Sequence, residues 1–223
     1  MDNDNIMVLE DIWKIYNNGE HVIHSLANID YTIEEGSFNI IYGPSGSGKS
    51  TLIRVMGLLE LPTMGNVWIK GKNSAELPQK KRNIIIREEI GFLFQGSNLI
   101  HTLNAIENVT LPMIHTDKEL ARKLLEKVDF HDYMKLPNEM STEDWQKVCL
   151  ARAMVNNHSI ILADEPTGDL HTSESEKLIK TLHELNRTEN LTVVITTNNE
   201  NIPKLGGKLT KIADGTFIHL NKL

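Results

Sequence analysis

A glycine-rich segment that ends in a lysine and a serine is the strongest chemical signal in the sequence. It reads Gly43-Pro44-Ser45-Gly46-Ser47-Gly48-Lys49-Ser50 and matches the pattern G-x-x-x-x-G-K-[ST] at every position. The glycines let backbone N–H groups turn toward an anion, and a helix that follows adds the partial positive charge of its N-terminus. In this pattern Lys49 reaches the β- and γ-phosphates and the Ser50 hydroxyl ligates Mg²⁺. The segment predicts a phosphate-binding loop; the alternative is a glycine-rich turn without a ligand.

Two carboxylates stand directly after an apolar segment in the second half of the chain. Asp164 and Glu165 follow Ile160–Ala163. If this segment is a strand, Asp164 can hold Mg²⁺ through water, and Glu165 can orient or deprotonate the water that attacks the γ-phosphate. The alternative is two exposed acids at a strand end. The intact phosphate loop favours the catalytic interpretation.

Buried strands and the helices that follow them must position these groups. Apolar, β-branched segments occur at Phe38–Tyr42, Ile160–Ala163 and Thr192–Thr196. Helix-like sequence follows two of them, at Ser50–Leu59 and Ser173–Leu185. Strands that alternate with helices are typical of an α/β fold with a mainly parallel sheet. A phosphate loop between a strand and a helix belongs to the P-loop NTPase arrangement, so we predict that core.

The first part of the chain has a different pattern. Residues 6–36 contain short alternating runs, which are separated by the turn signals Asn17–Gly19 and Glu34–Gly36. Alternation of this kind between turns predicts an N-terminal antiparallel β layer.

The middle of the chain predicts helices. Within residues 96–151, the segment Asp117–Val128 has apolar residues at helical spacing, namely Leu120, Leu124, Leu125 and Val128. We predict an α-helical subdomain over 96–151 that is inserted into an α/β core. The core comprises residues 1–95 and 152–223, and the whole chain 1–223 forms one domain.

The composition excludes several classes of protein. The 223 residues include 23 basic and 30 acidic side chains, which gives a formal net charge of −7. Such a chain lacks the basic face that non-specific nucleic-acid binding requires, so no nucleic-acid partner is expected. The one dense basic run, Lys80–Arg82, is expected to be a solvated loop. The single cysteine, Cys149, has apolar neighbours and is expected to be buried, without an internal disulfide, in a reducing compartment.

The sequence shows no membrane-spanning or secretory signal. Met1–Asn5 is acidic and polar, without the basic start and apolar stretch of a signal peptide. The longest apolar runs are far below the roughly 18 residues that span a bilayer. If the protein works at a membrane, we expect another chain to span it.

These residues, in this order, resemble the ABC ATPase family over nearly the whole chain. The resemblance is strongest to the branch of lipoprotein-releasing, macrolide-exporting and cell-division systems. Gly43–Leu52 resembles its Walker A motif, and Ala163–Leu170 resembles its Walker B motif and D-loop. Ile90–Gln95 resembles its Q-loop, and Thr102–Pro112 is similar to the stretch that follows. The family has a RecA-like P-loop core, in agreement with the strand pattern.

The resemblance implies roles for further residues. Gln95 would sense Mg²⁺ and face the membrane subunit, and Thr51 would line the nucleotide site. Tyr16 falls where the family places an aromatic ring that stacks on adenine; the alternative is that Tyr16 packs, since Trp13 is close by. The implied metal site comprises Ser50, Gln95 and Asp164. The residues expected to act in catalysis are Lys49, Gln95 and Glu165.

The family assembles two such domains head to tail. Each ATP lies between the phosphate loop of one subunit and the L-S-G-G-Q signature of the other, and the helical subdomain docks on a membrane permease. The resemblance therefore implies ATP and Mg²⁺ as cofactors, and a permease and a second ATPase subunit as partners, in a homodimer or a heterodimer. It places the protein on the cytoplasmic side of the cell membrane, bound through the permease.

The signature itself is altered. The aligned residues are Met140-Ser141-Thr142-Glu143-Asp144, in which only the serine remains. Ser141 and Asp144 can still form a capping box, so a helix is expected to start here. Glu143 and Asp144, however, put negative charge beside a triphosphate. At about 5 Å and an effective dielectric of about 20, one such pair costs about 3 kcal/mol, so this surface is expected to close poorly on ATP without help.

Two other positions depart from the family. Asn198 aligns with the histidine that contacts the γ-phosphate, and an amide can donate a hydrogen bond there without a positive charge. His171 stands where the D-loop usually ends in aspartate. Because all departures lie on the closing surface, we expect a chain that binds ATP well and hydrolyses it slowly alone. One hypothesis is a heterodimer, in which a partner with an intact signature completes the site.

The leading hypothesis for function is an ATPase subunit that couples ATP to transport through a permease. The alternative is a weakly hydrolysing or non-hydrolysing ATP-binding regulator that signals through a membrane partner. A DNA-repair or chromosome-organising ATPase is excluded, because those proteins carry a long coiled coil between the Walker motifs and no such heptad run occurs here.

Overall fold

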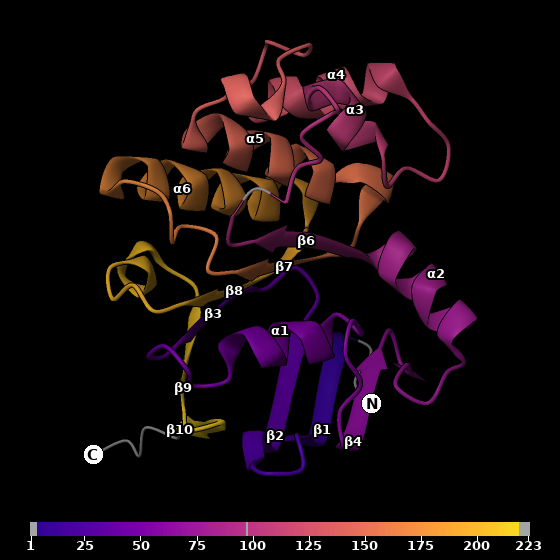
Figure 1. The fold of residues 1–223 in the computed structure, drawn as a ribbon, viewed down its shortest axis with the longest axis vertical. Coiled ribbons are helices and arrows are strands. Elements are labelled where there is room, and N and C mark those ends of the chain that lie inside the picture. The colour runs from indigo at the N-terminus through magenta and orange to yellow at the C-terminus, as the bar shows by residue number, and fades with distance from the viewer. Residues whose placement is uncertain (1–3, 97, 219–223) are drawn as a thin grey trace.

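The computed structural model describes residues 4–96 and 98–218, and these form two sheets and a layer of helices (Figure 1). Of the predicted polar start Met1–Asn5, the first three residues lie outside the described part. The first sheet has the strand order β2-β1-β4-β5 and is antiparallel throughout. Its strands are β1 (Asn5–Asn17), β2 (Val22–Glu34), β4 (Met64–Ile69) and β5 (Lys72–Asn73). The predicted N-terminal antiparallel layer is therefore confirmed, although β1 and β2 are long strands where short runs were expected.

The second sheet is mainly parallel, as predicted. Its strand order is β10-β9-β3-β8-β7-β6, and only β10 runs antiparallel to its neighbour. The strands are β3 (Phe38–Tyr42), β6 (Ile90–Phe94), β7 (Ile160–Asp164), β8 (Thr192–Thr197), β9 (Lys208–Ala213) and β10 (Thr216–Ile218). Because the strands are parallel, the carboxyl ends of β3, β6, β7 and β8 meet at one edge of the sheet.

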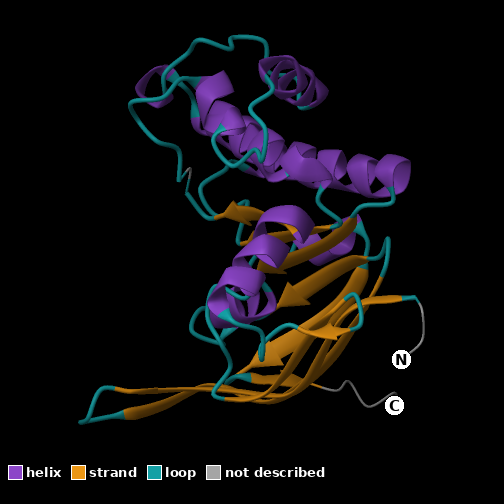
Figure 2. Cartoon of the chain, turned by 90° about the vertical axis from the view of Figure 1, so that its right-hand side faces the viewer, coloured by secondary structure: helices purple, strands orange, loops and turns teal. Residues whose placement is uncertain are grey.

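The helices cover both faces of this sheet. They are α1 (Lys49–Met56), α2 (Gln79–Glu89), α3 (Ala105–Thr110), α4 (Lys118–Lys127), α5 (Thr142–Ala153) and α6 (Thr172–Glu189). Short 3₁₀ turns occupy Pro137–Glu139, Val155–Asn157 and Ile202–Leu205. Figure 2 shows the long helices of the helical layer above the strands.

Alternating side chains of the buried strands divide between two hydrophobic cores. On β7, Ile160 and Leu162 pack with α1 and the antiparallel sheet, whereas Ile161 and Ala163 pack with α3–α6. Each side chain of this strand is covered, which is why its sequence is continuously apolar. Cys149 belongs to the second core and is buried, as expected, and burial raises its pKa to about 11.

The structure corrects two local predictions and confirms a third. Lys80–Arg82 lies in the first turns of α2 and not in a loop, although Lys80 and Lys81 are solvated. The helix predicted over Asp117–Val128 is confirmed as α4, in which Leu124, Leu125 and the adjoining Val128 are buried and Leu120 is 41% exposed. Helix α1 ends at Met56, before the predicted Leu59, because the chain leaves the helical conformation at Leu58, whose φ is +56°.

Helices α3, α4 and α5 gather at one end of the molecule, in the region predicted as a helical subdomain (Figure 1). Helix α5 continues to Ala153, two residues beyond the predicted boundary at 151. The division into a core of 1–95 and 152–223 and a subdomain of 96–151 stays a prediction. In the described part of the chain, no helix is long and apolar enough to cross a membrane.

Candidate functional site

The glycine-rich segment forms the connection between β3 and α1. The Gly43 N–H donates to the carbonyl of Thr197 on β8 (3.1 Å), which fixes the start of the loop against the sheet. A β-carbon at Gly43 would lie 2.2 Å from the Ile212 carbonyl, so this position requires glycine. Gly48 is the N-cap of α1 and has φ of +98°, a conformation that favours glycine.

The start of α1 is open to an anion. No side chain in the described part of the protein caps Gly48, so the first N–H groups of the helix face outward without a side-chain acceptor. Gly46 has φ of +80°, and a β-carbon there would meet nothing within 4 Å. A helix N-terminus with this free space beside it fits the phosphates of a nucleotide.

Lys49 is held at the centre of this loop. Its side chain is 3% exposed, and its ammonium donates to the carbonyls of Gly43 (2.9 Å) and Pro44 (2.8 Å). The same ammonium lies 3.1 Å from Oε1 of Glu165. The lysine is thus positioned by the loop it belongs to and by a carboxylate from the end of β7.

The two predicted carboxylates, Asp164 at the end of β7 and Glu165 directly after it, have different surroundings. Glu165 has φ of +44°, a left-handed conformation that is rare for a residue with a side chain and typical of functional sites. Its N–H donates to the Thr196 carbonyl (3.0 Å). Asp164 is buried, and its Oδ1 accepts a hydrogen bond from the Thr196 hydroxyl (2.7 Å). Thr196, which the sequence did not single out, therefore orients both acidic residues.

One pocket of about 380 Å³ brings most of the predicted residues together. Its lining comprises Ser25, Ser45, Gly46, Gly48, Lys49, Ser50, Thr51, Gln95, Glu165 and Asn198. Ser25 is new; its hydroxyl donates to that of Thr51 (2.8 Å). The amide of Asn198 donates to the Ser45 hydroxyl (3.4 Å), so this substitute for histidine reaches the phosphate loop.

Five predicted residues do not line this pocket. They are Tyr16, Gly43, Pro44, Ser47 and Asp164. Gly43 and Pro44 act through their carbonyls on Lys49, and Asp164 is buried at the end of β7. Ser47 is buried, and its carbonyl accepts from the Gly215 N–H (3.1 Å), which ties the loop to the β9–β10 turn.

Tyr16 is part of a separate polar cluster on β1. Its hydroxyl donates to Oε2 of Glu60 (2.6 Å), and the Lys14 ammonium lies 5.2 Å from its ring centroid. Glu60 also pairs with Lys14 (3.3 Å) and Arg54 (3.4 Å). Burial raises the pKa of Glu60, but the hydrogen bonds from Tyr16 and Lys14 outweigh it and hold that pKa below its ordinary value. Both roles of Tyr16, adenine platform and packing residue, stay open.

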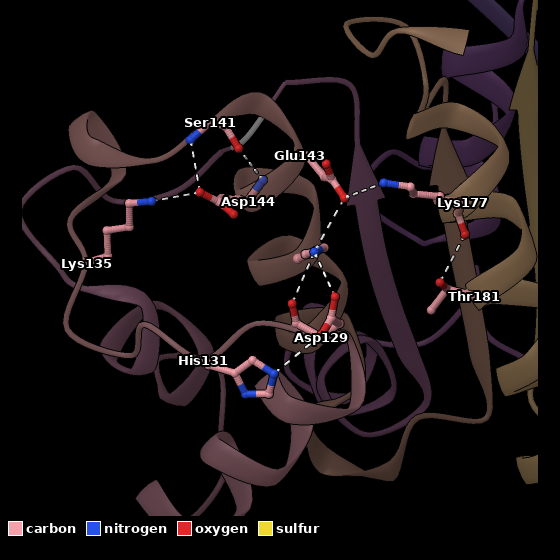
Figure 3. A network of polar contacts seen from close by, with 9 residues as sticks. Asp129, His131, Lys135, Ser141, Glu143, Asp144, Lys177 and Thr181 are labelled. Carbon is pink, nitrogen blue, oxygen red and sulfur yellow. Dashed lines mark hydrogen bonds and ion pairs between the residues drawn. The ribbon is translucent and has the colours of Figure 1, made fainter. Parts of the chain in front are cut away.

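The altered signature forms a well-capped helix start, as predicted. The Ser141 hydroxyl accepts from the Asp144 N–H (3.1 Å), and the Asp144 carboxylate accepts from the Ser141 N–H (3.2 Å). The expectation that this surface closes poorly on ATP stays a prediction, and in the structure both acids are paired with lysines of their own chain. Figure 3 shows each carboxylate in contact with lysines: Asp144 with Lys135, and Glu143 with the side chains that reach it from α5 and α6.

Comparison with known proteins decides the family. The model of the ABC transporter family matches residues 26–168. An uncharacterized ABC transporter ATP-binding protein of Methanocaldococcus jannaschii, MJ1508, is 39% identical over 95% of this chain and 97% of its own length. The chain belongs to the ABC transporter ATP-binding family. The resemblance inferred from the Walker motifs is thereby confirmed.

Solved structures and an exporter extend the comparison. A dimeric structure of the ABC transporter cassette MJ0796 has a TM-score of 0.89 at 37% identity and covers 96% of this chain and 97% of that one. A second dimeric structure of MJ0796, in a post-hydrolysis state bound to ADP and Pi, has the same TM-score at 36% identity. The macrolide export protein MacB of Bdellovibrio bacteriovorus, which joins ATP-binding and permease parts, is 38% identical over 94% of this chain but only 33% of its own length. The fold of this ATP-binding domain is thus that of the ABC cassette.

Proposed function

We propose that this chain binds MgATP in the pocket at the start of α1 and hydrolyses it as the ATP-binding subunit of an ABC transporter. The observation that carries the proposal is the convergence of nine residues predicted from the sequence on one pocket, with the buried Lys49 ammonium 3.1 Å from Glu165. A cation that is already desolvated and held by carbonyls is prepared to receive a triphosphate.

Each residue has a role that follows from its place. Lys49 and the N–H groups at the start of α1 hold the phosphates. Ser50, Gln95 and Asp164 supply the hydroxyl, amide and carboxylate oxygens that suit Mg²⁺, and the bound ion offsets phosphate charge. Glu165 orients and deprotonates the attacking water, which its position on the pocket wall allows.

A permease is the proposed membrane partner. An apolar groove of about 530 Å³ lies between β6 and the segment after α3, and its wall includes Phe92, Phe94, Leu111 and Met113. Phe92 and Phe94 stack at 5.3 Å, and Gln95 follows directly in the chain. A short permease segment in this groove would contact β6, the strand that the pocket residue Gln95 directly follows. We propose that the chain lies on the cytoplasmic side of the cell membrane, bound through the permease, as the family resemblance implies.

A second candidate is an ATP-binding regulator that signals through a membrane partner with little turnover. Asn198 favours it, since its neutral amide occupies the position from which a cationic histidine would contact the γ-phosphate. The altered helix start at Ser141 favours it as well.

Turnover of the complex separates the two functions. Mg²⁺-dependent phosphate release is measured for the chain reconstituted with its permease in vesicles, and for the variants Glu165→Gln and Glu176→Gln. Glu176 is an exposed residue of α6 and is the matched control. The transporter function predicts turnover that Glu165→Gln lowers at least about 100-fold and Glu176→Gln leaves unchanged. ATP binding without any Mg²⁺-dependent turnover in the complex would instead support the regulator.

A further inference from the structure

Asp144, which stands in the signature in place of glutamine, is neutralised within its own chain. Its Oδ2 accepts from the Lys135 ammonium (2.9 Å) and from the Ser141 N–H (3.2 Å). Burial raises the pKa of Asp144, but the hydrogen bonds from Lys135 and Ser141 hold that pKa below its ordinary value. A single carboxylate oxygen thus joins the lysine to the one signature residue that remains unchanged.

Glu143, which stands in place of the second glycine, is neutralised on the other side of the helix. Its Oε1 lies 3.4 Å from the Lys147 ammonium, one turn further along α5, and 3.6 Å from that of Lys177 on α6. Lys147 also donates to the Asp129 carbonyl (3.1 Å) after α4. A line of alternating charges therefore runs from the end of α4 through α5 to α6, as Figure 3 shows.

The two carboxylates point away from each other across the start of α5. In Figure 3 Asp144 turns toward Lys135, and Glu143 turns toward Lys177. Both acids are half-buried, whereas Ser141 is exposed. The backbone at these described positions has ordinary negative φ angles, so the helix start accepts β-carbons without strain. What the altered signature presents to solvent is therefore the serine, flanked by paired charges.

We propose that Lys135, Lys147 and Lys177 are charge-compensating residues that make the altered signature compatible with the triphosphate held by a second copy of this chain, so that two copies close head to tail over MgATP. The inference rests on the proposed function, because it requires ATP in the pocket at α1. Charge compensation by these lysines removes the electrostatic reason for expecting a different ATPase as the partner subunit. The acids that would repel the phosphates already have cations within hydrogen-bond or ion-pair distance.

The choice of a second copy follows from the charges. In a dimer of two identical chains, both composite sites contain Glu143 and Asp144, so any uncompensated repulsion would act twice. Three lysine ammonium groups surround these two carboxylates, although Asp129 lies near Lys147, and Asp132 and Glu139 act on Lys135. Each of the two signature acids therefore has a cation partner within its own chain. The cassette MJ0796, whose fold this chain shares, is itself dimeric in solved structures.

The test measures ATP-dependent association of the full chain. The parent is Glu165→Gln, which retains bound ATP if Glu165 is the catalytic carboxylate, and the dimer Kd is measured by sedimentation in MgATP. Lys135→Met should weaken the dimer about tenfold, because it leaves Asp144 as an unpaired acid beside the phosphates. Lys135→Met combined with Asp144→Asn should restore the Kd to within about threefold of the parent, and Lys135→Arg should preserve it.

Lys208→Met is the control, since Lys208 pairs with Glu34 (3.8 Å) at the far end of β9 and the change removes the same charge. ATP binding is measured in parallel, because it distinguishes a failure of the second-copy inference from a failure of the proposed function. If the parent binds MgATP but stays monomeric, the second-copy inference is wrong while the proposed function stands. Equal Kd values for Lys135→Met and Lys208→Met, or a double variant as weak as Lys135→Met, overturn the role of Lys135. A parent that does not bind MgATP removes the proposed function and the inference together.

Discussion

The Lys49 ammonium lies 3.1 Å from Oε1 of Glu165. Both residues line the pocket that is predicted to hold the γ-phosphate of ATP. The two groups are partners in the described structure, and the proposed function requires Lys49 to exchange the carboxylate for phosphate oxygens. The exchange leaves Glu165 unpaired, and an unpaired carboxylate is a better base for water than one that is neutralised by a lysine.

Glu165→Gln should therefore bind ATP more tightly as well as turn it over more slowly. The amide keeps the size of the side chain but removes both the competition for Lys49 and the repulsion of the γ-phosphate. We expect the Kd for a Mg²⁺-bound non-hydrolysable ATP analogue to fall about threefold to tenfold, measured by calorimetry. Glu176→Gln should leave it unchanged. Weaker binding by Glu165→Gln would show that the carboxylate contributes to holding the nucleotide.

Thr196→Val should weaken the Mg²⁺ dependence of ATP binding, so that more Mg²⁺ is needed for half-maximal binding. The Thr196 hydroxyl is buried and donates to Asp164 (2.7 Å), so its loss frees the carboxylate that is expected to hold the ion through water. Loss of such an orienting partner typically costs about tenfold or more in metal affinity. The Mg²⁺ concentration for half-maximal ATP binding should rise accordingly. Thr192→Val, a buried threonine at the other end of β8, is the control, and an equal effect there would assign the change to stability alone.

Glu60→Gln should weaken binding of ATP but not of tripolyphosphate. Glu60 accepts from the Tyr16 hydroxyl (2.6 Å) and so fixes the ring that is predicted to stack on adenine. Without the carboxylate, we expect the ATP Kd to rise about threefold to tenfold, in the range of a lost charge-assisted hydrogen bond. Glu10→Gln is the matched control. Glu10 lies on β1, the strand of Tyr16, and like Glu60 it accepts a hydrogen bond from an aromatic side chain, that of Trp68 (2.7 Å). Parallel losses for ATP and tripolyphosphate would mean that Tyr16 packs and does not bind the base.

Cys149 should resist thiol reagents in the folded protein. Burial raises its pKa to about 11, although Arg152 acts in the opposite direction, so the reactive thiolate is scarce at pH 8. Alkylation by iodoacetamide should be at least about 100-fold slower in the native chain than in urea, followed by mass spectrometry. Rapid native alkylation would contradict the packing of α5 against the core.

The parts of the site that lie within one motif could be predicted from the sequence, and the parts that depend on sheet register could not. Gly43–Ser50 carries its geometry locally, since a strand, a glycine loop and a helix follow each other in the chain. Thr196 and Ser25 reach the site only because β8 lies beside β7 and β2 beside α1. The sequence around Ser25 contains no signal of that proximity. For Thr196 the only indication was its place at the end of a predicted central strand.

The contacts of the altered signature could also be predicted only in part from the sequence. The capping box of Ser141 and Asp144 was predictable because its two residues are three positions apart on one helix. The pairing of Glu143 with Lys147 is also local, because the two residues are four positions apart on α5. The contact of Glu143 with Lys177, more than thirty positions later, exists only because α6 packs against α5, and nothing in the local sequence indicates it.

Titration of the purified chain with MgATP tests the central claim most directly. Calorimetry compares the natural chain with Lys49→Ala and with Lys80→Ala, an exposed lysine of α2 that has no part in the site. The account predicts one MgATP per chain for the natural protein and for Lys80→Ala, with equal Kd. It predicts a Kd at least about 100-fold higher for Lys49→Ala, because charge-assisted hydrogen bonds to the phosphates are lost. MgATP binding by Lys49→Ala that is as tight as binding by Lys80→Ala would contradict it.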